Sequence, residues 1–560
     1  MHKDLLKELI REIEIKNPKN QKELNKIKFN FSKKHKLKKI PSNIELAAQI
    51  KDDKFSQILT IKPTRNISGV NVVAIMTKPS NCPYGKCIYC PGGVESYFGD
   101  VPQSYTGHEP ASMRAKRNDY DAYLQVMNRL EQYSAMNKLS GKIEMIVMGG
   151  TFPSFPVKYQ ENFVSDAFKA QNDFSRMFFK NNKFESEKFN EFFELPGNIR
   201  NKERTERIKS KLMKLKEKSN LEIEQKKNET SKIRCVALCV ETRPDFCRKK
   251  HINEMLKLGV TRVELGVQTV YDDILKKIKR GHTVEDSIEA TQLLKDSFLK
   301  VGYHMMPGLP GSNYDLDYKC FKEIFSNPDF KPDAIKIYPC MVMPGTKLYE
   351  IWKRKKFDPM ISEDATNLIC EIKKIIPKYC RIMRIQRDIP TNITSAGVDK
   401  TNLRQYVSKK MKEKNITCNC IRCMEPRGRE IDFDSAKLNV SKYEASHSTE
   451  FFISFDDMKN DILIGYCRLR IPWKPFRKEI IKNSAGIREL HVFGEAAAIG
   501  EKGIIQHHGF GKRLIEEAER IAKEDFDCSK ILVISGIGAR EYYRKKLNYR
   551  DDWVYLSKGI

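Results

Sequence analysis

The sequence predicts an α/β protein: a partial (βα) barrel, then a cysteine-rich linker, then a smaller α+β domain. Between about residues 61 and 390, short apolar runs alternate with segments of helical periodicity, which is typical of parallel βα units. From about residue 435 the order changes to successive short strands and a helix opened by a Gly-rich turn. We predict barrel strands at residues 70–76, 143–148, 236–240, 262–267, 300–305 and 334–338.

Composition favours a polyanionic partner. The 560 residues include 102 Lys and Arg against 73 Asp and Glu, a formal net charge of +29. Such an excess favours nucleic acid, although a Lys-rich solvated surface gives the same number. No segment has the ~18–20 uncharged apolar residues of a membrane span, and the N-terminus lacks a signal peptide, so we expect a cytoplasmic protein without membrane contact. Its fifteen cysteines then point to metal or redox roles rather than disulfides.

Two charged regions interrupt the pattern. Residues 1–60 form a predicted basic, RNA-binding N-terminal region, in which ten lysines and a single acid, Glu23, lie between Lys16 and Lys39. Residues 61–390 form the barrel domain. Within it, residues from about 170 to 232 are dense in Lys and Glu, and we expect them to form a solvent-facing helical insertion without chemistry.

A cysteine triplet follows the first predicted strand. Cys82, Cys87 and Cys90 have the spacing C-x4-C-x2-C. Three thiolates can ligate three irons of a 4Fe–4S cluster, which leaves one iron open for a small molecule. The alternative is a zinc knuckle, which needs a fourth ligand, and no further Cys or His lies within a dozen residues.

This loop resembles that of the radical S-adenosylmethionine (SAM) enzymes, with an aromatic residue, Tyr89, before the third cysteine. Its spacing is one residue longer than the common C-x3-C-x2-C. The resemblance implies that the open iron binds SAM and yields a deoxyadenosyl radical. It also implies SAM contacts at the ends of two later strands, at Gly149, Gly150, Glu264 and Gln268.

Residues 506–512 match the Q-x-x-G-x-G turn of the GNAT acetyltransferases. Glycines let the backbone approach a ligand closely, and a helix N-terminus favours a pyrophosphate. The family places the pantetheine arm along the preceding strand. It also places a tyrosine near the thioester sulfur, where Tyr542 and Tyr543 are candidates to protonate the thiolate and Tyr543 is favoured. The remaining predicted acetyl-CoA contacts in this domain (residues 435–560) are Glu489, Leu490, His491, Val492, Gly509, Phe510, Gly511 and Lys512.

The linker, residues 391–434, holds a second cysteine cluster. Cys418, Cys420 and Cys423 form C-x-C-x2-C, which supplies three soft ligands at zinc spacing. A structural zinc site needs four ligands, and Cys380 is the predicted fourth, with His447 or Cys340 as substitutes. We interpret the cluster as a structural zinc site rather than a second redox centre.

Five segments in order resemble the catalytic subunits of Elongator in their archaeal-type form: residues 87–93, 103–114, 147–152, 241–245 and 386–390. The resemblance implies 5-carboxymethyl formation on the wobble uridine of tRNA from acetyl-CoA, with the anticodon stem–loop bound through phosphates. It further implies an acetyl-CoA contact at Lys142, the linker zinc, an external electron donor, and a homodimer or accessory subunits. The alternative is a protein lysine acetyltransferase with a structural iron–sulfur domain, which would need an Asp or Glu as general base.

Overall fold

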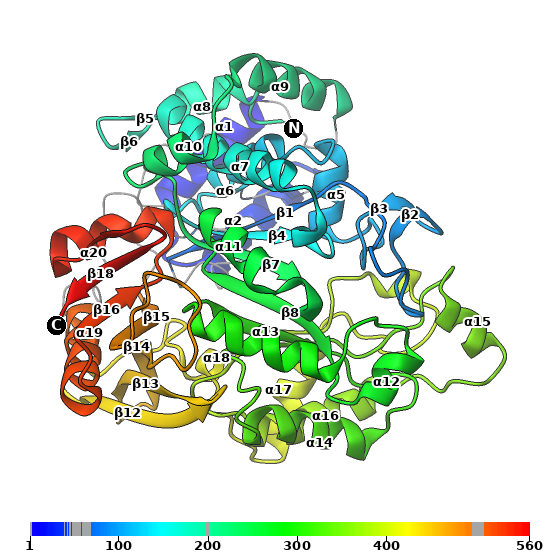
Figure 1. The fold of residues 1–560 in the computed structure, drawn as a ribbon. Helices are drawn as coiled ribbons and strands as arrows, with labels where there is room; N and C mark the ends of the chain where they lie inside the picture. Colours follow the sequence, from blue (N-terminus) through cyan, green and yellow to red (C-terminus); the bar gives the residue numbers. More distant parts are fainter. Residues whose placement is uncertain are drawn as a thin grey trace.

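The computed structural model describes residues 3–37, 69–197, 201–494 and 509–560, together with residues 40, 41, 43, 46 and 58. Its described part contains two seven-stranded sheets, one in the barrel and one in the C-terminal domain (Figure 1). None of the described helices combines the length and apolar character that crossing a membrane requires.

The first sheet is the partial barrel, with strand order β1-β4-β7-β8-β9-β10-β11. All neighbouring strands are parallel, so their carboxyl ends meet at one edge. The six predicted strands are present within two residues of their predicted ends, and the seventh, β11, was not predicted. The strands are β1 Asn71–Met76, β4 Lys142–Met148, β7 Arg234–Thr242, β8 Arg262–Gln268, β9 Lys300–Met305, β10 Ala334–Ile337 and β11 Arg381–Ile385.

Helices follow the barrel strands because their apolar stripes need the outer face of the sheet. They are α5 Pro110–Arg117, α6 Ala122–Ala135, α7 Val157–Phe178, α11 Lys249–Lys257, α12 Asp272–Lys277, α13 Val284–Asp296, α14 Tyr314–Ser326, α15 Lys347–Lys353 and α16 Ser362–Ile375. The hairpin of β2 Gly93–Ser96 and β3 Gly99–Val101 follows the cysteine triplet. Two linker helices, α17 Leu403–Glu413 and α18 Ile421–Met424, come after the barrel.

The N-terminal region forms two described helices, α1 Lys3–Lys16 and α2 Gln21–Lys34. Leu9, Leu24 and Phe31 bury their side chains in a small core between them. Lys7, Lys16, Lys22, Lys26, Lys33 and Lys34 are exposed, whereas Lys28 is buried. Phe29 is 57% exposed.

The charged insertion contains α8 Ser186–Phe192, α9 Lys202–Leu215 and α10 Leu221–Asn228. It is not purely solvent-facing, contrary to expectation. Glu229, at the end of α10, pairs with Arg544 of the C-terminal domain, with oxygen–nitrogen distances of 2.9 Å. The insertion therefore braces one domain against the other.

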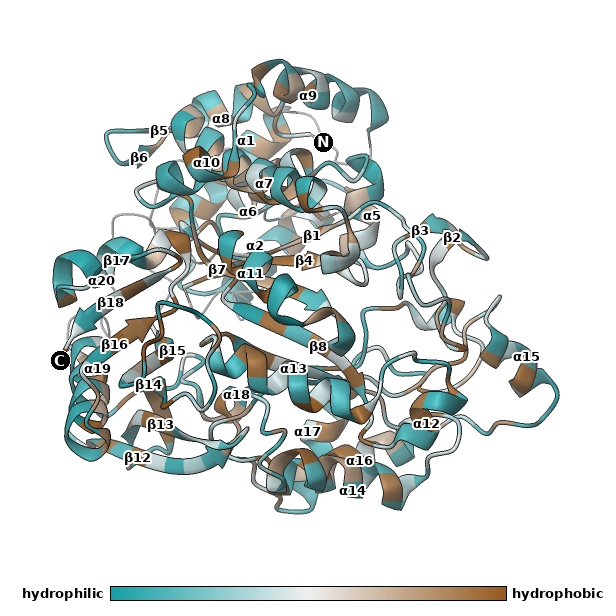
Figure 2. Cartoon of the chain, viewed as in Figure 1, coloured by the Kyte–Doolittle hydropathy of each residue, from teal (hydrophilic) through white to brown (hydrophobic). Residues whose placement is uncertain are grey.

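The second sheet has the order β12-β13-β14-β15-β16-β18-β17. Strands β15 and β16 pair in parallel only from Ser484↔Lys530 to Ile487↔Val533 and then part. The edge strand β12, which was not predicted, is mostly exposed; Figure 2 shows it mostly teal and white, whereas β16 is brown. The elements are β12 Ala436–Ala445, β13 Ser448–Asp457, β14 Ile462–Arg470, β15 Ser484–Val492, α19 Phe510–Arg520, β16 Lys530–Val533, α20 Arg540–Leu547, β17 Arg550–Asp552 and β18 Tyr555–Gly559.

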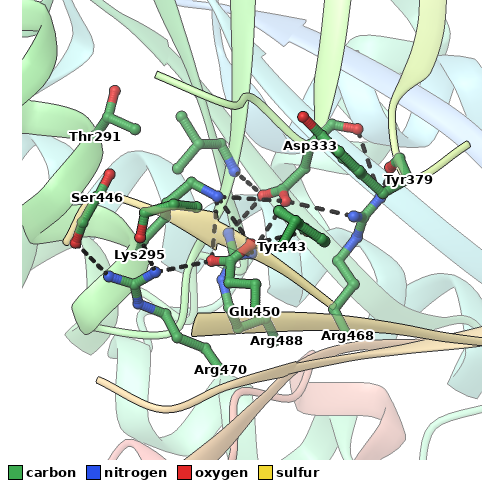
Figure 3. A network of polar contacts seen from close by, with 12 residues as sticks. Thr291, Lys295, Asp333, Tyr379, Tyr443, Ser446, Glu450, Arg468, Arg470 and Arg488 are labelled. Atoms are coloured by element: carbon green, nitrogen blue, oxygen red, sulfur yellow. Dashed lines mark hydrogen bonds and ion pairs between the residues drawn. The ribbon is translucent and has the colours of Figure 1, made fainter. Parts of the chain in front are cut away.

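A buried ionic cluster joins the two domains, and we call it the interface cluster (Figure 3). Arg488 of β15 donates to Asp333 at 2.5 Å, and Lys295 at the end of α13 donates to Glu450 of β13 at 3.0 Å. Arg470 of β14 donates to Asp296 at 2.6 Å and to Glu450 at 3.1 Å. Lys295, Asp296 and Asp333 belong to the barrel side. Its members are Lys295, Asp296, Asp333, Glu450, Arg468, Arg470 and Arg488, each at most 2% exposed except Asp333 at 3%.

Candidate radical and acetyl-CoA sites

The cysteine triplet lies in the loop that follows β1, at the carboxyl edge of the barrel. Arg243 donates from Nη1 to Cys82 Sγ at 3.8 Å, and Arg280 donates from Nη1 to Cys87 Sγ at 3.8 Å. Burial and the charge of Cys87 raise the pKa of the third thiol, Cys90. Adjacent guanidinium groups stabilise thiolates, and three thiolates fit the ligand set of an iron–sulfur cluster.

All three cysteines line one cavity with about 1090 Å³ of space, including the part open to solvent. Of the predicted SAM contacts, Gly150 and Gln268 line this cavity. Gln268 Oε1 is buried and has no hydrogen-bond partner among the described residues, so it can accept from a ligand. The neighbouring Gly149 has φ 123°, and a Cβ there would lie 2.2 Å from Thr77 Oγ1, so the strand end requires glycine. These residues fit a ligand with donor groups beside the cluster.

Glu264, the remaining predicted SAM contact, lies deeper in the barrel. Its carboxylate pairs with Lys336 of β10 and lies 3.0 Å from His304 Nε2. Lys336 Nζ also donates to Glu241 Oε1 at 3.0 Å. We call Glu241, Glu264, His304 and Lys336 the barrel cluster. Glu241 and His304 line the cavity, whereas Glu264 does not.

Charge pairing outweighs burial in the barrel cluster. Burial alone would lower the pKa of Lys336, but Glu264 and Glu241 raise it well above its ordinary value. Burial would likewise raise the pKa of Glu264, but Lys336, His304 and Arg262 lower it. Lys336 thus occupies the position that a metal ion would take between two carboxylates and an imidazole. Sequence reasoning missed Glu241, His304 and Lys336 as site residues; the available signal was an ionisable residue in the carboxyl-terminal half of an otherwise largely apolar strand.

Further ionisable side chains lie inside the barrel between the barrel cluster and the amino ends of the strands. Arg262, the first residue of β8, pairs with Glu144 at 2.6 Å and reaches Glu264 at 3.4 Å. Barrel interiors are usually filled by branched apolar side chains. Here ionisable groups fill the interior between the cavity and the end that the C-terminal domain covers.

The predicted acetyl-CoA turn begins α19, beside the gap between β15 and β16. Gly509 has φ 69°, a left-handed conformation that favours glycine. A Cβ at Gly511 would lie 3.0 Å from the hydroxyl of Tyr542 and 3.9 Å from Leu490 Cδ2. The turn, β15 and α20 therefore meet at one place, with Phe510 buried and Lys512 exposed on α19. Residues 506–508 of the motif lie outside the described residues.

The four predicted residues on β15 divide between two faces. Leu490 and Val492 pack against the core of the C-terminal domain. Glu489 faces the barrel and pairs with Lys300 at 3.0 Å and Arg468 at 2.9 Å. Burial would raise the pKa of Glu489, but Lys300 and Arg468 lower it well below its ordinary range. Burial lowers the pKa of His491 to about 4, so it is neutral at pH 7.

The two candidate tyrosines have different surroundings. Tyr543 is 6% exposed and packs in the core of the C-terminal domain, where burial strongly raises its pKa. Tyr542 is 39% exposed, with its hydroxyl beside Gly511. The geometry therefore favours Tyr542, not the expected Tyr543, at the ligand.

The two sites lie at opposite ends of the barrel. The cysteines follow the carboxyl end of β1, whereas Glu489 and its neighbours contact first residues of strands such as Lys300. Lys142, the predicted acetyl-CoA contact from the barrel, is the first residue of β4 and half-buried. Strands of six or seven residues separate the sites by roughly 20 Å.

The linker cysteines converge. Ligand atoms of Cys418, Cys420 and Cys423 lie within 4.8 Å of one another. Lys373 Nζ donates to Cys423 Sγ at 3.3 Å, and hydrogen bonds from the other two thiols lower the pKa of Cys423. Cys380 is adjacent through its carbonyl, which accepts from Ile421 N at 3.1 Å, but its thiol is outside this group.

Family models match most of the chain. The ELP3 N-terminal domain matches residues 2–67, the Radical SAM superfamily 77–317, the Radical SAM C-terminal domain 332–413, and the acetyltransferase (GNAT) family 420–549. These matches imply a 4Fe–4S cluster, SAM and acetyl-CoA as ligands.

Whole-chain relatives agree with these matches. A protein of Methanocaldococcus infernus named tRNA uridine(34) acetyltransferase is 49% identical, covering 93% of this chain and 92% of its own. Elongator complex protein 3 of Saccharomyces cerevisiae is 39% identical over 96% and 92%. The solved archaeal Elp3 of M. infernus, lacking residues 1–46, has a TM-score of 0.72 at 46% identity and covers 88% of this chain and 100% of its own. The chain therefore belongs to the family of Elongator complex protein 3 and the tRNA uridine(34) acetyltransferases.

Proposed function

We propose that this protein modifies the wobble uridine of cytoplasmic tRNA, forming a 5-carboxymethyl group from acetyl-CoA by radical SAM chemistry. The main observation in support is the cavity in which Cys82, Cys87 and Cys90 lie beside two arginines, in a chain that also has the GNAT turn. The name of the Methanocaldococcus infernus relative, tRNA uridine(34) acetyltransferase, supports uridine 34 as the modified nucleoside.

At the cavity, the three cysteines would hold the 4Fe–4S cluster, and Arg243 and Arg280 would offset the negative charge of their thiolates. Gln268 and the backbone of Gly149 and Gly150 would orient SAM. When bound, and with an external electron donor, the cluster and SAM would supply a radical that can remove hydrogen from an unactivated methyl group. The barrel cluster fixes Glu241 and His304 on the cavity wall.

At the other end, Gly509–Lys512 receives the pyrophosphate of acetyl-CoA at the start of α19, and the β15 backbone at Leu490 and Val492 holds the pantetheine arm. We assign protonation of the thiolate to the Tyr542 hydroxyl, which lies beside Gly511. The two sites lie at opposite ends of the barrel strands, so the length of a strand separates the cysteine loop from the acetyl-CoA turn.

The rival function, protein lysine acetylation, needs a carboxylate that accepts a proton from an amine. Glu489 is the acid on the strand beside the cleft, but its lowered pKa and its pairing with Lys300 and Arg468 make it a poor base. This observation favours the radical function.

We assign a structural zinc to Cys418, Cys420 and Cys423, whose soft thiol donors fit zinc, with Cys380 as the fourth ligand after a side-chain rotation. We also assign tRNA phosphate binding to the exposed lysines of α1 and α2, with the exposed Phe29 available for stacking on a base.

Anaerobic reconstitution with iron, sulfide, reductant, SAM, acetyl-CoA and bulk tRNA tests the proposal, with nucleoside mass spectrometry as the readout. We expect carboxymethyluridine from the wild type and from the control Cys528→Ser, which alters a cysteine of the C-terminal domain. Cys87→Ser should form none while still binding acetyl-CoA. Acetylated lysine in added protein, with no modified uridine, would establish the rival.

A further inference from the structure

Cations mark the amino ends of the barrel strands. Five of the seven strands begin with Lys or Arg, at the end that faces the C-terminal domain: Lys142, Arg234, Arg262, Lys300 and Arg381. Burying a row of like charges is unfavourable unless each has a counter-charge. Where each counter-charge lies therefore shows which cations are structural.

Three of these cations have acidic partners. Arg262 pairs with Glu144 at 2.6 Å, and Lys300 pairs with Glu489 at 3.0 Å. The third, Arg381, pairs with Glu425 at 2.6 Å. These pairs tie the barrel to itself, to β15 and to the linker, so they are accounted for by structure.

Lys142 and Arg234 have no acidic partner among the described residues. They face each other in register on neighbouring parallel strands, so their side chains leave the same face of the sheet. Both are half-buried, and burial lowers the pKa of each; the charge of Arg234 lowers that of Lys142 further. Two adjacent, half-buried cations that lack a counter-charge form a site for an anion.

The cation pair adjoins the acetyl-CoA cleft. The short helix η8 Ile537–Ala539, which links β16 to α20, packs on the start of β7. A Cβ at Gly538 would lie 2.5 Å from the Cβ of Arg234, and one at Gly536 would lie 2.1 Å from the carbonyl oxygen of Val236. The same connection leads into α20, whose Tyr542 contacts the Gly511 turn.

We infer that Arg234, together with Lys142, binds a phosphate group of coenzyme A from the barrel side of the cleft. A guanidinium can grip a phosphate through two parallel hydrogen bonds, while the lysine adds a point charge. Resemblance to the family predicts only Lys142. The inference rests on the proposed acetyl-CoA binding and makes the coenzyme a bridge between both domains.

Calorimetric titration of the anaerobically prepared full-length protein, with bulk tRNA present, tests this. The ligands are acetyl-CoA, acetyl-dephospho-CoA, which lacks the 3′-phosphate, and acetylpantetheine, which lacks every CoA phosphate. We expect Arg234→Gln to weaken acetyl-CoA binding about tenfold and to leave acetylpantetheine binding unchanged. Arg234→Lys should recover part of the loss. Lys232→Gln, which removes an exposed lysine two residues earlier, should match the wild type.

The dephospho ligand identifies the phosphate. If the variant's defect persists with it, Arg234 contacts the pyrophosphate; if the defect vanishes, Arg234 contacts the 3′-phosphate. Unchanged acetyl-CoA affinity in a variant with wild-type thermal unfolding overturns the inference, as does an equal loss for acetylpantetheine. A wild type that binds none of the ligands instead refutes the proposed acetyl-CoA function.

Discussion

The barrel cluster and the interface cluster both pair carboxylates with cations in the interior of the protein, yet they differ in access to a cavity. Lys336 balances Glu241 and Glu264 beside a cavity that two cluster residues line. In the interface cluster, Arg470 and Arg488 engage Asp296, Asp333 and Glu450, and none of these residues lines that cavity.

Burial and ion pairing alone therefore do not distinguish a charged residue with a functional role from one with a structural role. Both clusters carry strongly shifted pKa values because their charges are packed in a low-dielectric interior. A closed cluster, one with no residue that lines the cavity, holds two parts of the chain in one geometry. An open cluster, one with residues that line the cavity, presents oriented charges to a ligand. Removing a charge from an open cluster should therefore reduce activity more than stability.

The largest effect should come from breaking the closed cluster. Arg470→Met leaves Asp296 and Glu450 without their shared cation in the dry interface, which should cost about 3–5 kcal/mol of unfolding free energy. The urea unfolding midpoint measures this. Arg520→Met, which breaks only exposed ion pairs on α19, should cost less than about 1 kcal/mol. Equal midpoints for both variants would show that the interface admits water.

Breaking the open cluster should act on catalysis. Lys336→Met leaves the carboxylates of Glu241 and Glu264 unbalanced at the cavity wall, and we expect carboxymethyluridine formation to fall about 100-fold. The stability loss should be smaller than for Arg470→Met, because water from the cavity can solvate the carboxylate of Glu241, which lines it. Lys336→Arg keeps the charge and should retain more activity. A variant that unfolds as early as Arg470→Met would erase the distinction between the clusters.

A smaller, pH-dependent effect should sharpen the comparison. His491 faces Glu489, Lys300, Arg381 and Glu425, and its pKa of about 4 lies below the unfolded value of about 6.5. The unfolded state therefore binds more protons between these values. The contribution of the neutral His491 imidazole to the free energy of unfolding is complete above pH 6.5. It falls by up to about 1.4 kcal/mol per pH unit toward pH 4.

Urea unfolding at pH 7, 6 and 5 checks this, with His491→Gln as the reference. The wild type should lose stability more steeply than the variant as the pH falls. Parallel slopes would mean that the imidazole titrates as it does in water and that this side of the interface is wet.

Much of the fold could be predicted because it follows from local apolar patterns. All six predicted barrel strands are present, but β11 was missed because Arg381 and Arg384 interrupt its apolar run. Strand β12 was missed because it is an edge strand with few buried positions. Both depend on pairing with a neighbour that a single sequence does not reveal.

The candidate sites divide in the same way. Contiguous motifs predicted the cysteine triplet, its cavity neighbours and the Gly turn. The roles of Lys336 and Arg234 depend on residues about one hundred positions away, such as Glu241 and Lys142, so no spacing rule could reveal them. The choice between Tyr542 and Tyr543 depends on which side chain faces the turn, and sequence does not say this because adjacent helix positions point in different directions.

Glu229 of the insertion pairs with Arg544 near the end of the chain, and the interface cluster forms a second, separate contact between the two domains. The polypeptide is thus clasped to itself at points distant from the connecting segment 391–434. After proteolytic cleavage within that connector, both pieces should still sediment together. The association of the two domains therefore does not depend on the peptide connection between them.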